Sequence, residues 1–418
     1  MQNITEAFAD YLFDKAERIP GPILERAEAC LQDTLSVTLA GAAKNRKRWE
    51  ALLRRLPLGT AELVGYPETT DGKTAALING FNAHSLELDD GQRFAMIHLG
   101  ASVISAVRAA GPDSEKRELT GIVMGYEAAC RAAITMQPSH KNRGFHAAGT
   151  CGTIGAAVGA AFALGLDRRQ MKRVLSCAAG SAAGMLEMQE QGSELKPYNV
   201  GRAAMDGLAA AEMGLVDFET PADMLGGERG FFRSYADQYA PEKLTEKTAY
   251  YEIERIYVKP YASCRHSHSA VEAAIRLHES LDPERIESVE VRTYRLGVKG
   301  HDHTEIRGIA SAKLSTPYAV AAGLLLGRAD LTAFEPLDEG VLKLAKKVSV
   351  AEDPELTRES PQKRVAVVTV TLRDGTSRSA RVDYAKGDPE NPMSPEEMEE
   401  KRKLLSAYAA SCREKWSL

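Results

Sequence analysis

The sequence predicts a mainly α-helical protein with an inserted α+β domain: a large all-helical domain built from both chain ends plus a smaller α+β domain. Residues up to about 250 show one helical apolar period after another, whereas a period of two begins after Tyr257. A strong helix signal returns near the C-terminal end. Because 418 residues are too many for one compact core, we expect a helical domain over 1–257 and 389–418 and an α+β domain over 258–388.

Helical signals follow one another in the N-terminal region. Asp71 is placed to cap a helix running toward Glu87, because its carboxylate can accept from the first free backbone N–H groups. Other segments are expected to be helices because their apolar residues recur with the helical period. These segments are 1–20, 23–40, 115–133 and 203–215.

Small residues recur along 150–166, where Gly152, Gly155, Gly159 and Ala163 stand three or four positions apart. This spacing puts them on one side of a helix, and small residues there let two helix backbones approach closely. The segment therefore predicts dense helix packing.

Period-two patterns mark the α+β region. Residues 286–294 alternate between apolar and polar, as a half-buried strand does. Residues 364–384 hold two strand-like runs separated by Asp-Gly at 374–375, which is a strong hairpin signal. Helical segments are expected between these strands, at 267–280 and 311–326.

The last helix has a clear start signal. Ser394 and Glu397 form a capping-box pattern, and Pro395 occupies the first helical position. The character of this helix matches the first region, so we assign the residues after 388 to the helical domain.

Composition limits the function classes. Lys and Arg total 53 against 58 Asp and Glu, a net charge of −5 that gives no general attraction to nucleic acid or anionic membrane. The N-terminal residues do not resemble a signal peptide, and the low-polarity run 151–166 is too short to span a membrane. Six cysteines without a CxxC pair indicate reduced thiols, and we expect a cytoplasmic protein.

Protonatable residues gather at loops next to predicted helix starts, where free N–H groups attract anions. His146 precedes the glycine-rich helix, with Thr150 adding a hydroxyl, and Lys196 and Arg202 surround a second start. Such loops would suit a carboxylate. From these segments alone, an ordinary glycine loop and a solvated surface lysine are the simpler interpretations.

Two His-x-His pairs, His266 with His268 and His301 with His303, raise the alternative of a metal site. The sequence has no HExxH and no paired Cys to complete one, so chance pairing is favoured. It also lacks the glycine-rich nucleotide motifs and the serine-hydrolase elbow. The isolated histidines His140 and His278 are expected to be surface or packing residues.

Seven stretches, taken in order along the chain, resemble the MmgE/PrpD family, which includes 2-methylcitrate dehydratases, cis-aconitate decarboxylases and iminodisuccinate epimerases. The stretches are HSLELDDGQRFAMIHLGA (84–101), RGFHAAGTCGTIGAA (143–157), GSELKPYNVGRAAMDG (192–207), GERGFFRSY (227–235), KPYASCRHSHSAVEAA (259–274), AKLSTPYAVAAGLL (312–325) and GDPENPMSPEEM (387–398). The resemblance implies a homodimer, an active site between a helical and an α+β domain, and no required metal or organic cofactor.

The resemblance also selects site residues. It implies catalytic roles for His98, His146, Lys196, Tyr318 and Asp90. Substrate-binding roles are expected for Lys259, Arg265, His268, Asp89 and Thr150. Compared with decarboxylase-like members, this chain departs from the pattern at Glu87, Gly91, Leu99 and Cys264.

The reaction implied by the resemblance starts next to a carboxylate of a small polycarboxylate substrate. Fixed cations must stabilise the charge that develops there, and a general base and a general acid must move protons. For a dehydration, we expect His146 or Lys196 to abstract the proton, His98 or Tyr318 to protonate the leaving hydroxyl, and Asp90 to orient His98. A hydro-lyase is the leading hypothesis. An isomerase, epimerase or decarboxylase comes second, and a metal-dependent hydrolase or a non-enzymatic binding role is remote.

Overall fold

The computed structural model describes residues 3–188 and 193–414, and it divides into two compact units. Unit 1 comprises Met1–Met188, Leu195–Ile256 and Glu397–Leu418. Unit 2 comprises Gln189–Glu194 and Tyr257–Glu396. The predicted fold class, mainly helical with a smaller α+β part, is confirmed.

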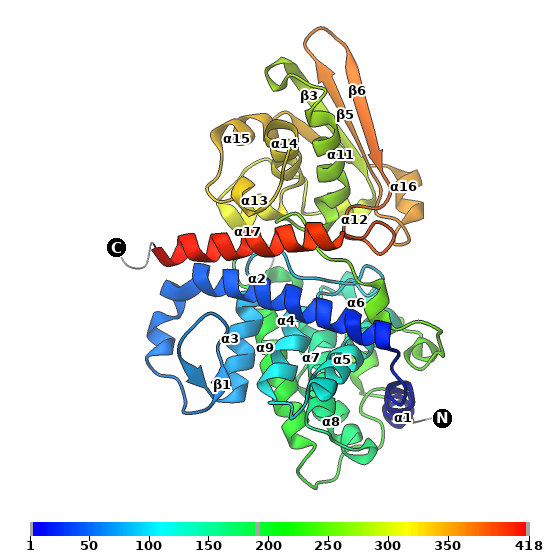
Figure 1. Cartoon of the computed structure of the whole chain (residues 1–418). Helices are drawn as coiled ribbons and strands as arrows, with labels where there is room; N and C mark the ends of the chain where they lie inside the picture. The colour runs from blue at the N-terminus through cyan, green and yellow to red at the C-terminus, as the bar shows by residue number, and fades with distance from the viewer. Residues whose placement is uncertain (1–2, 189–192, 415–418) are drawn as a thin grey trace. The chain divides into compact units, whose positions relative to one another are not determined.

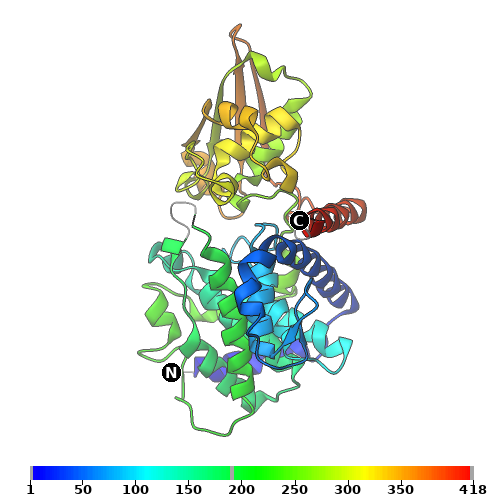
Figure 2. The same cartoon turned by 90° about the vertical axis from the view of Figure 1, so that its left-hand side faces the viewer.

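Unit 1 is a bundle of helices packed around α7, which contacts α4, α5 and α9 (Figures 1 and 2). Its core is rich in alanine, and α7 itself is buried along almost its whole length. The helices are α1 (Ile4–Ala16), α2 (Gly21–Leu53), α3 (Gly72–His84), α4 (Gly100–Ala109), α5 (Glu115–Met136), α6 (Ser139–Asn142), α7 (Ala147–Ala163), α8 (Arg168–Ser181), α9 (Lys196–Met213), α10 (Phe231–Tyr235) and α17 (Pro395–Glu414).

The dense packing predicted from the small residues of α7 is confirmed. A Cβ atom on Gly155 would lie 2.6 Å from the carbonyl oxygen of Gly125 on α5. One on Gly159 would lie 2.9 Å from the carbonyl oxygen of Gly121. Because backbone atoms occupy the space that a side chain would need, glycine lets α5 and α7 meet at their backbones.

The end of α3 and the start of α9 differ from the predicted ones. Asp71 caps α3 by accepting from the Lys73 and Thr74 amides, as predicted. The helix ends at His84, not at Glu87, because Glu87 has a positive φ of 57°. Helix α9 begins at Lys196, well before the predicted start at 203.

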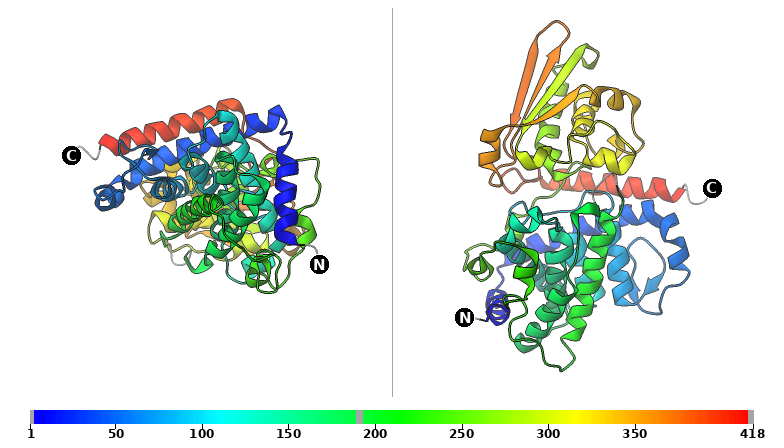
Figure 3. Two further views of the ribbon diagram at one scale, coloured as in Figure 1. Left: turned by 90° about the horizontal axis from the view of Figure 1, so that it is seen from below. Right: turned by 180° about the vertical axis from the view of Figure 1, so that it is seen from behind.

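The C-terminal helix α17 runs beside α2 (Figures 1 and 3). Lys401 on α17 forms a buried ion pair with Asp33 on α2, at 2.7 Å. Its ammonium group also donates to the carbonyl of Leu88 at 3.1 Å. The end of the chain therefore supports the loop that follows α3.

Unit 2 is a four-stranded sheet in the order β4-β3-β5-β6, with β3 and β4 parallel and the other pairs antiparallel. The helices α11 (His268–His278), α14 (Thr316–Leu326) and α15 (Glu339–Ala345) lie on one side of the sheet (Figures 1 and 2). The strands are β3 (Ile286–Thr293), β4 (Val348–Glu352), β5 (Ala366–Leu372) and β6 (Ser377–Val382). On β5 buried residues alternate with partly exposed ones, which fits a sheet covered on one face.

Unit 2 confirms the predicted hairpin and corrects one helix. Gly375 adopts a φ of 83° between β5 and β6, the left-handed conformation that glycine tolerates in a hairpin turn. The helix expected over 311–326 is broken into α13 (Ile309–Leu314) and α14. Ser315 separates them because its side chain caps α14 by accepting from the Tyr318 amide.

Among the helices of residues 3–188 and 193–414, none has both the length and the hydropathy that a membrane span requires.

Candidate active site

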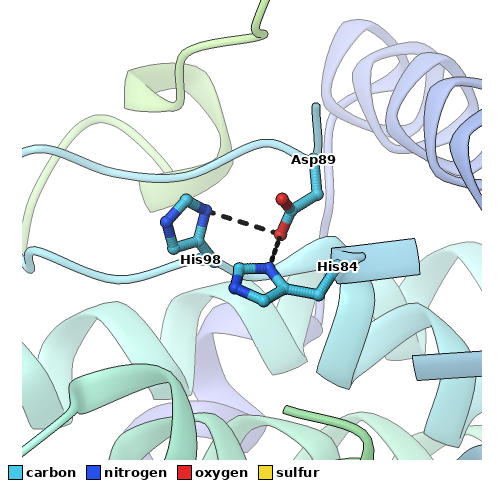
Figure 4. A group of neighbouring side chains, drawn as sticks. All are labelled: His84, Asp89 and His98. Carbon is cyan, nitrogen blue, oxygen red and sulfur yellow. Dashed lines mark hydrogen bonds and ion pairs between the residues drawn. The ribbon is translucent and has the colours of Figure 1, made fainter. Parts of the chain in front are cut away.

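One carboxylate orients two histidines after helix α3. Oδ2 of Asp89 lies 2.7 Å from Nδ1 of His84 and 3.4 Å from Nδ1 of His98 (Figure 4). The two rings meet edge to face with centroids 4.8 Å apart. In each ring, the second nitrogen points away from Asp89 (Figure 4). Asp89 thus orients both rings through their Nδ1 atoms.

The tautomer of His98 follows from a second contact. Its Nδ1 also lies 3.0 Å from the main-chain carbonyl oxygen of Asp90. A carbonyl can only accept, so Nδ1 carries the proton and donates it. In the neutral ring, Nε2 then holds a lone pair. His98 is partly exposed, with 14% of its side chain accessible, and this lone pair gives it the character of a base.

The loop between α3 and α4 folds back on itself to create this geometry. The backbones of Gln92 and Ile97 pair in an antiparallel bridge, with hydrogen bonds of 2.9 and 3.3 Å. The Gln92 side chain accepts from the Ala95 amide and donates to Glu252. Because these bonds fix the turn, the acidic pair at 89–90 is held opposite His98.

Asp90, predicted to orient His98, contacts that ring through its main-chain carbonyl, and its carboxylate makes other contacts. Its Oδ1 accepts from the Gly100 amide at 2.8 Å, and its Oδ2 accepts from the Tyr126 hydroxyl at 2.5 Å. The carboxylate thereby caps α4 from inside the core, and burial raises the pKa of Asp90 to about 6. Orientation of His98 comes instead from the Asp90 carbonyl and from the neighbouring Asp89 carboxylate.

Lys196 is neutralised by an acid that the sequence analysis did not select as a site residue. It is the first residue of α9 and forms a buried ion pair with Glu87. A helix N-terminus disfavours a cation, so the partner carboxylate is needed there. Glu87 also lies 3.9 Å from Nε2 of His84, and its positive φ is uncommon for a non-glycine residue. Such a backbone conformation at a buried charge is typical of functional sites.

His146 has the opposite tautomer to His98. It precedes α7, and its backbone amide donates to the Gly184 carbonyl at 3.2 Å. The Asn199 side-chain amide nitrogen donates to Nδ1 at 2.9 Å, which leaves the ring proton on Nε2. Burial first, and then the charges of Lys196 and other nearby groups, hold the pKa of His146 well below its usual value. His146 is therefore a neutral ring that presents an N–H group.

Thr150 lies one turn into α7 and faces His140. The Thr150 hydroxyl lies 2.8 Å from Nε2 of His140, and both side chains are fully buried. His140 is thus a packing residue of the interior, one of the two possibilities predicted for it. Its pKa is lowered to about 4 by burial and by Arg143. The use of the Thr150 hydroxyl to bind a substrate carboxylate stays a prediction.

Within unit 2, Arg265 and His268 bind one another and neighbouring loops. Arg265 pairs with Asp388 at 2.6 Å and donates to Nδ1 of His268 at 2.8 Å. The other nitrogen of His268 donates to the Ser263 carbonyl at 3.1 Å. Both side chains are buried, and these contacts connect the start of α11 to the segment at 385–388. The structure gives them a stabilising role within unit 2.

Tyr318 and Lys259 are also buried in unit 2. The Tyr318 hydroxyl donates to the Ala333 carbonyl at 3.1 Å and accepts from the Asp338 amide at 3.3 Å. The role of Tyr318 as a general acid stays a prediction. Lys259 has no exposed surface.

Three potential metal ligands converge in unit 1. His84, Asp89 and His98 each offer one ligand atom, and these atoms lie within 4.8 Å of one another. They are the one such group among the described residues. Nδ1 of His98 donates its proton to a carbonyl and Oδ2 of Asp89 accepts from His84, so these atoms already take part in hydrogen bonds. The His-x-His pairs lie outside this group.

Comparison with protein families identifies the chain. The model of the MmgE/PrpD N-terminal domain matches residues 6–243, and that of the MmgE/PrpD C-terminal domain matches residues 261–416. The chain belongs to the MmgE/PrpD family. The residues gathered around Asp89 therefore lie within the N-terminal domain of this family.

Similar proteins within the family carry the name cis-aconitate decarboxylase. The one from Aspergillus terreus is 26% identical over 422 residues, covering 93% of this chain and 86% of that protein. The one from Homo sapiens is 24% identical over 437 residues, covering 96% of this chain and 87% of that protein. The one from Mus musculus is 24% identical over 426 residues, covering 96% and 86%.

The structure adds His84, Glu87 and Asn199 to the residues predicted from the sequence. His84 and Glu87 lie in the same stretch as Asp89 and His98, so their proximity in sequence was an available signal. Asn199 is 53 residues from His146, and no local pattern connects the two.

Proposed function

We propose that this member of the MmgE/PrpD family is a lyase that moves a proton next to a carboxylate of a small polycarboxylate, with dehydration as the leading reaction. The observation that carries the proposal is that two histidines in unit 1 are opposite tautomers, with the ring proton on different nitrogens. Nε2 of His98 is a base, because its Nδ1 donates to the Asp90 carbonyl. Nε2 of His146 carries a proton, because its Nδ1 accepts from Asn199.

These tautomers assign the proton abstraction to His98 and not to His146, which the sequence favoured. His98 removes the proton from the carbon beside the carboxylate, and the negative charge spreads into that carboxylate. Lys196 stabilises this charge, and the ion pair with Glu87 keeps the lysine in place. The imidazolium formed on His98 then gives its proton to the leaving hydroxyl, while neutral His146 donates a hydrogen bond to that hydroxyl from Nε2, and the products are an alkene and water. Asp89 keeps the His98 ring in the orientation that this step needs.

Decarboxylation is the second candidate, and the names of the relatives favour it. In that reaction the bond to a carboxyl group breaks, and the same lysine stabilises the carbanion that remains. A protonated imidazole then delivers a proton to carbon. Epimerisation needs only the abstraction and return of the proton, so it uses a subset of the same groups.

NMR in deuterated buffer separates these reactions. The protein is mixed with 2-methylcitrate, citrate, cis-aconitate and malate in turn. A new alkene from a hydroxy acid supports dehydration, loss of CO2 supports decarboxylation, and deuterium exchange without net reaction supports epimerisation. The proposal is wrong if no proton next to a carboxylate exchanges in any substrate that the protein binds.

Variants test the assigned residues. His98→Gln and His146→Gln should each lower kcat by about 10²–10⁴-fold on the substrate identified. His278→Gln is the matched control, because that histidine donates to the Leu324 carbonyl within unit 2. Near wild-type turnover in either site variant would exclude the proposed pair.

A further inference from the structure

Unit 2 contains a cysteine and a histidine paired outside the unit 1 cluster. Sγ of Cys264 lies 3.8 Å from Nε2 of His301, within hydrogen-bond distance for sulfur. Cys264 is half-buried and directly precedes the turn Arg265–Ser267. Its backbone amide donates to the Lys313 carbonyl at 2.8 Å, so its position is fixed by the main chain.

The tautomer of His301 directs its lone pair at the thiol. Nδ1 of His301 lies 3.0 Å from the Leu314 carbonyl oxygen, which can only accept. Nδ1 therefore holds the proton, and Nε2 is the acceptor that faces Cys264. The His301 backbone is held on both sides, by its amide donating to Val298 and its carbonyl accepting from Thr316. A fixed base beside a thiol is the arrangement that activates cysteine as a nucleophile.

The surrounding charges include both signs. The ring of His266 lies 5.2 Å from that of His301, and its Nδ1 is 2.7 Å from the Tyr294 hydroxyl. Tyr294 is buried, and burial raises its pKa, so it remains a neutral phenol. Arg265, Arg364 and Asp388 are among the charged groups that act electrostatically on Tyr294.

The other cysteines of the chain provide a comparison for Cys264. Cys30, Cys130 and Cys151 are buried, and burial raises the pKa of each thiol. Burial also raises the pKa of Cys177. Cys412 is half-buried on α17, like Cys264, and serves as an internal reference.

We propose that Cys264 and His301 form a reactive thiol–imidazole pair, a covalent modification site for soft carbon electrophiles. With iodoacetamide, a C–S bond forms on Cys264, the C–I bond breaks, and iodide leaves. The thiol proton passes to Nε2 of His301. This inference concerns unit 2 alone and does not depend on the proposed reaction.

The test is alkylation of the full-length protein with iodoacetamide, followed residue by residue with peptide mass spectrometry between pH 5.5 and 9. Cys264 should react about fivefold faster than Cys412 at pH 6, since a lower thiol pKa gives more thiolate but a weaker nucleophile. Its half-maximal rate should fall at least about one pH unit below the value of about 8.5 for a free thiol.

Variants assign the effect to the pair. His301→Gln should bring the pH midpoint of Cys264 close to that of Cys412, whereas His303→Gln should leave it unchanged because His303 contacts Ser311 instead. Thermal melts establish that both variants fold. If wild-type Cys264 reacts no faster than Cys412 at pH 6, the proposal is wrong, and this comparison needs no variant. An unchanged midpoint in folded His301→Gln would likewise overturn it.

Discussion

Asp89 and His98 are held 3.4 Å apart, and the same oxygen of Asp89 also accepts from His84 at 2.7 Å. One carboxylate thus fixes two imidazole rings, and it leaves their outer nitrogens facing the same side (Figure 4). The arrangement resembles the acid that orients the histidine of a catalytic triad, with two rings in place of one.

Replacing the shared carboxylate should slow turnover more than it weakens binding. Asp89→Asn keeps the shape but removes the charge that favours the Nδ1–H tautomers, so kcat should fall by about 10²-fold or more. Steady-state kinetics on the identified substrate gives the answer. Asp206→Asn is the matched control, since Asp206 pairs with Arg202 on the surface of α9. An unchanged kcat in Asp89→Asn would show that the orientation is not needed.

Breaking the buried ion pair should destabilise the fold. Glu87→Gln leaves the Lys196 ammonium without its carboxylate, and a buried charge that loses its partner typically costs about 3–5 kcal/mol. Urea denaturation should report this loss of unfolding free energy. The double variant Glu87→Gln/Lys196→Met should recover part of it, because no unpaired charge remains. A double variant no more stable than Glu87→Gln would contradict the explanation.

His140 should make the fold less stable in acid. Its pKa is about 4 in the folded protein and about 6.5 when unfolded, so the unfolded chain binds a proton first as the pH falls. Stability should therefore decline from pH 6.5 to 4, by up to about 3 kcal/mol. The difference in unfolding free energy between wild type and His140→Gln isolates this contribution. A difference that stays constant over that range would mean that His140 titrates normally.

Asp90 should make the fold less stable as the pH rises, which is the opposite of the effect of His140, and the two pH ranges overlap. Burial raises its pKa to about 6 from 3.8, so the folded protein holds the proton longer than the unfolded chain. This residue's contribution to stability should fall as the pH rises from 3.8 to 6, by up to about 3 kcal/mol. In Asp90→Asn the amide still accepts from Gly100, and the decline should vanish. Denaturation at several pH values, compared with wild type, measures it.

Most of the fold could be predicted from local sequence signals. Asp71, the hairpin at 374–375 and the small residues of α7 each act within a few positions, and the structure bears them out. Strand β4 was not predicted. It is five residues long and pairs in parallel with β3, with Val348 opposite Val289, about 60 residues earlier in the chain. Such pairing leaves no local pattern.

Less of the candidate site could be predicted from the sequence. Motif resemblance selected His98, His146 and Lys196, but it could not assign tautomers. The proton on His146 depends on which atom of Asn199 faces the ring, and that on His98 depends on a carbonyl eight residues away. The sequence carries no record of these contacts, because they arise only when the loop between α3 and α4 and helix α9 meet their partners.

The ion pair between Asp33 and Lys401 joins positions 368 residues apart in the chain. During synthesis on the ribosome, α2 emerges early and its buried carboxylate has no counter-charge until the last helix is made. Unit 2 is translated in full during that interval. The loop that carries Asp89 also lacks one of its hydrogen bonds until then, because Lys401 donates to the Leu88 carbonyl. The nascent chain should therefore acquire its active arrangement only after α17 has been made, and the growing N-terminal bundle is a segment that chaperones are expected to protect.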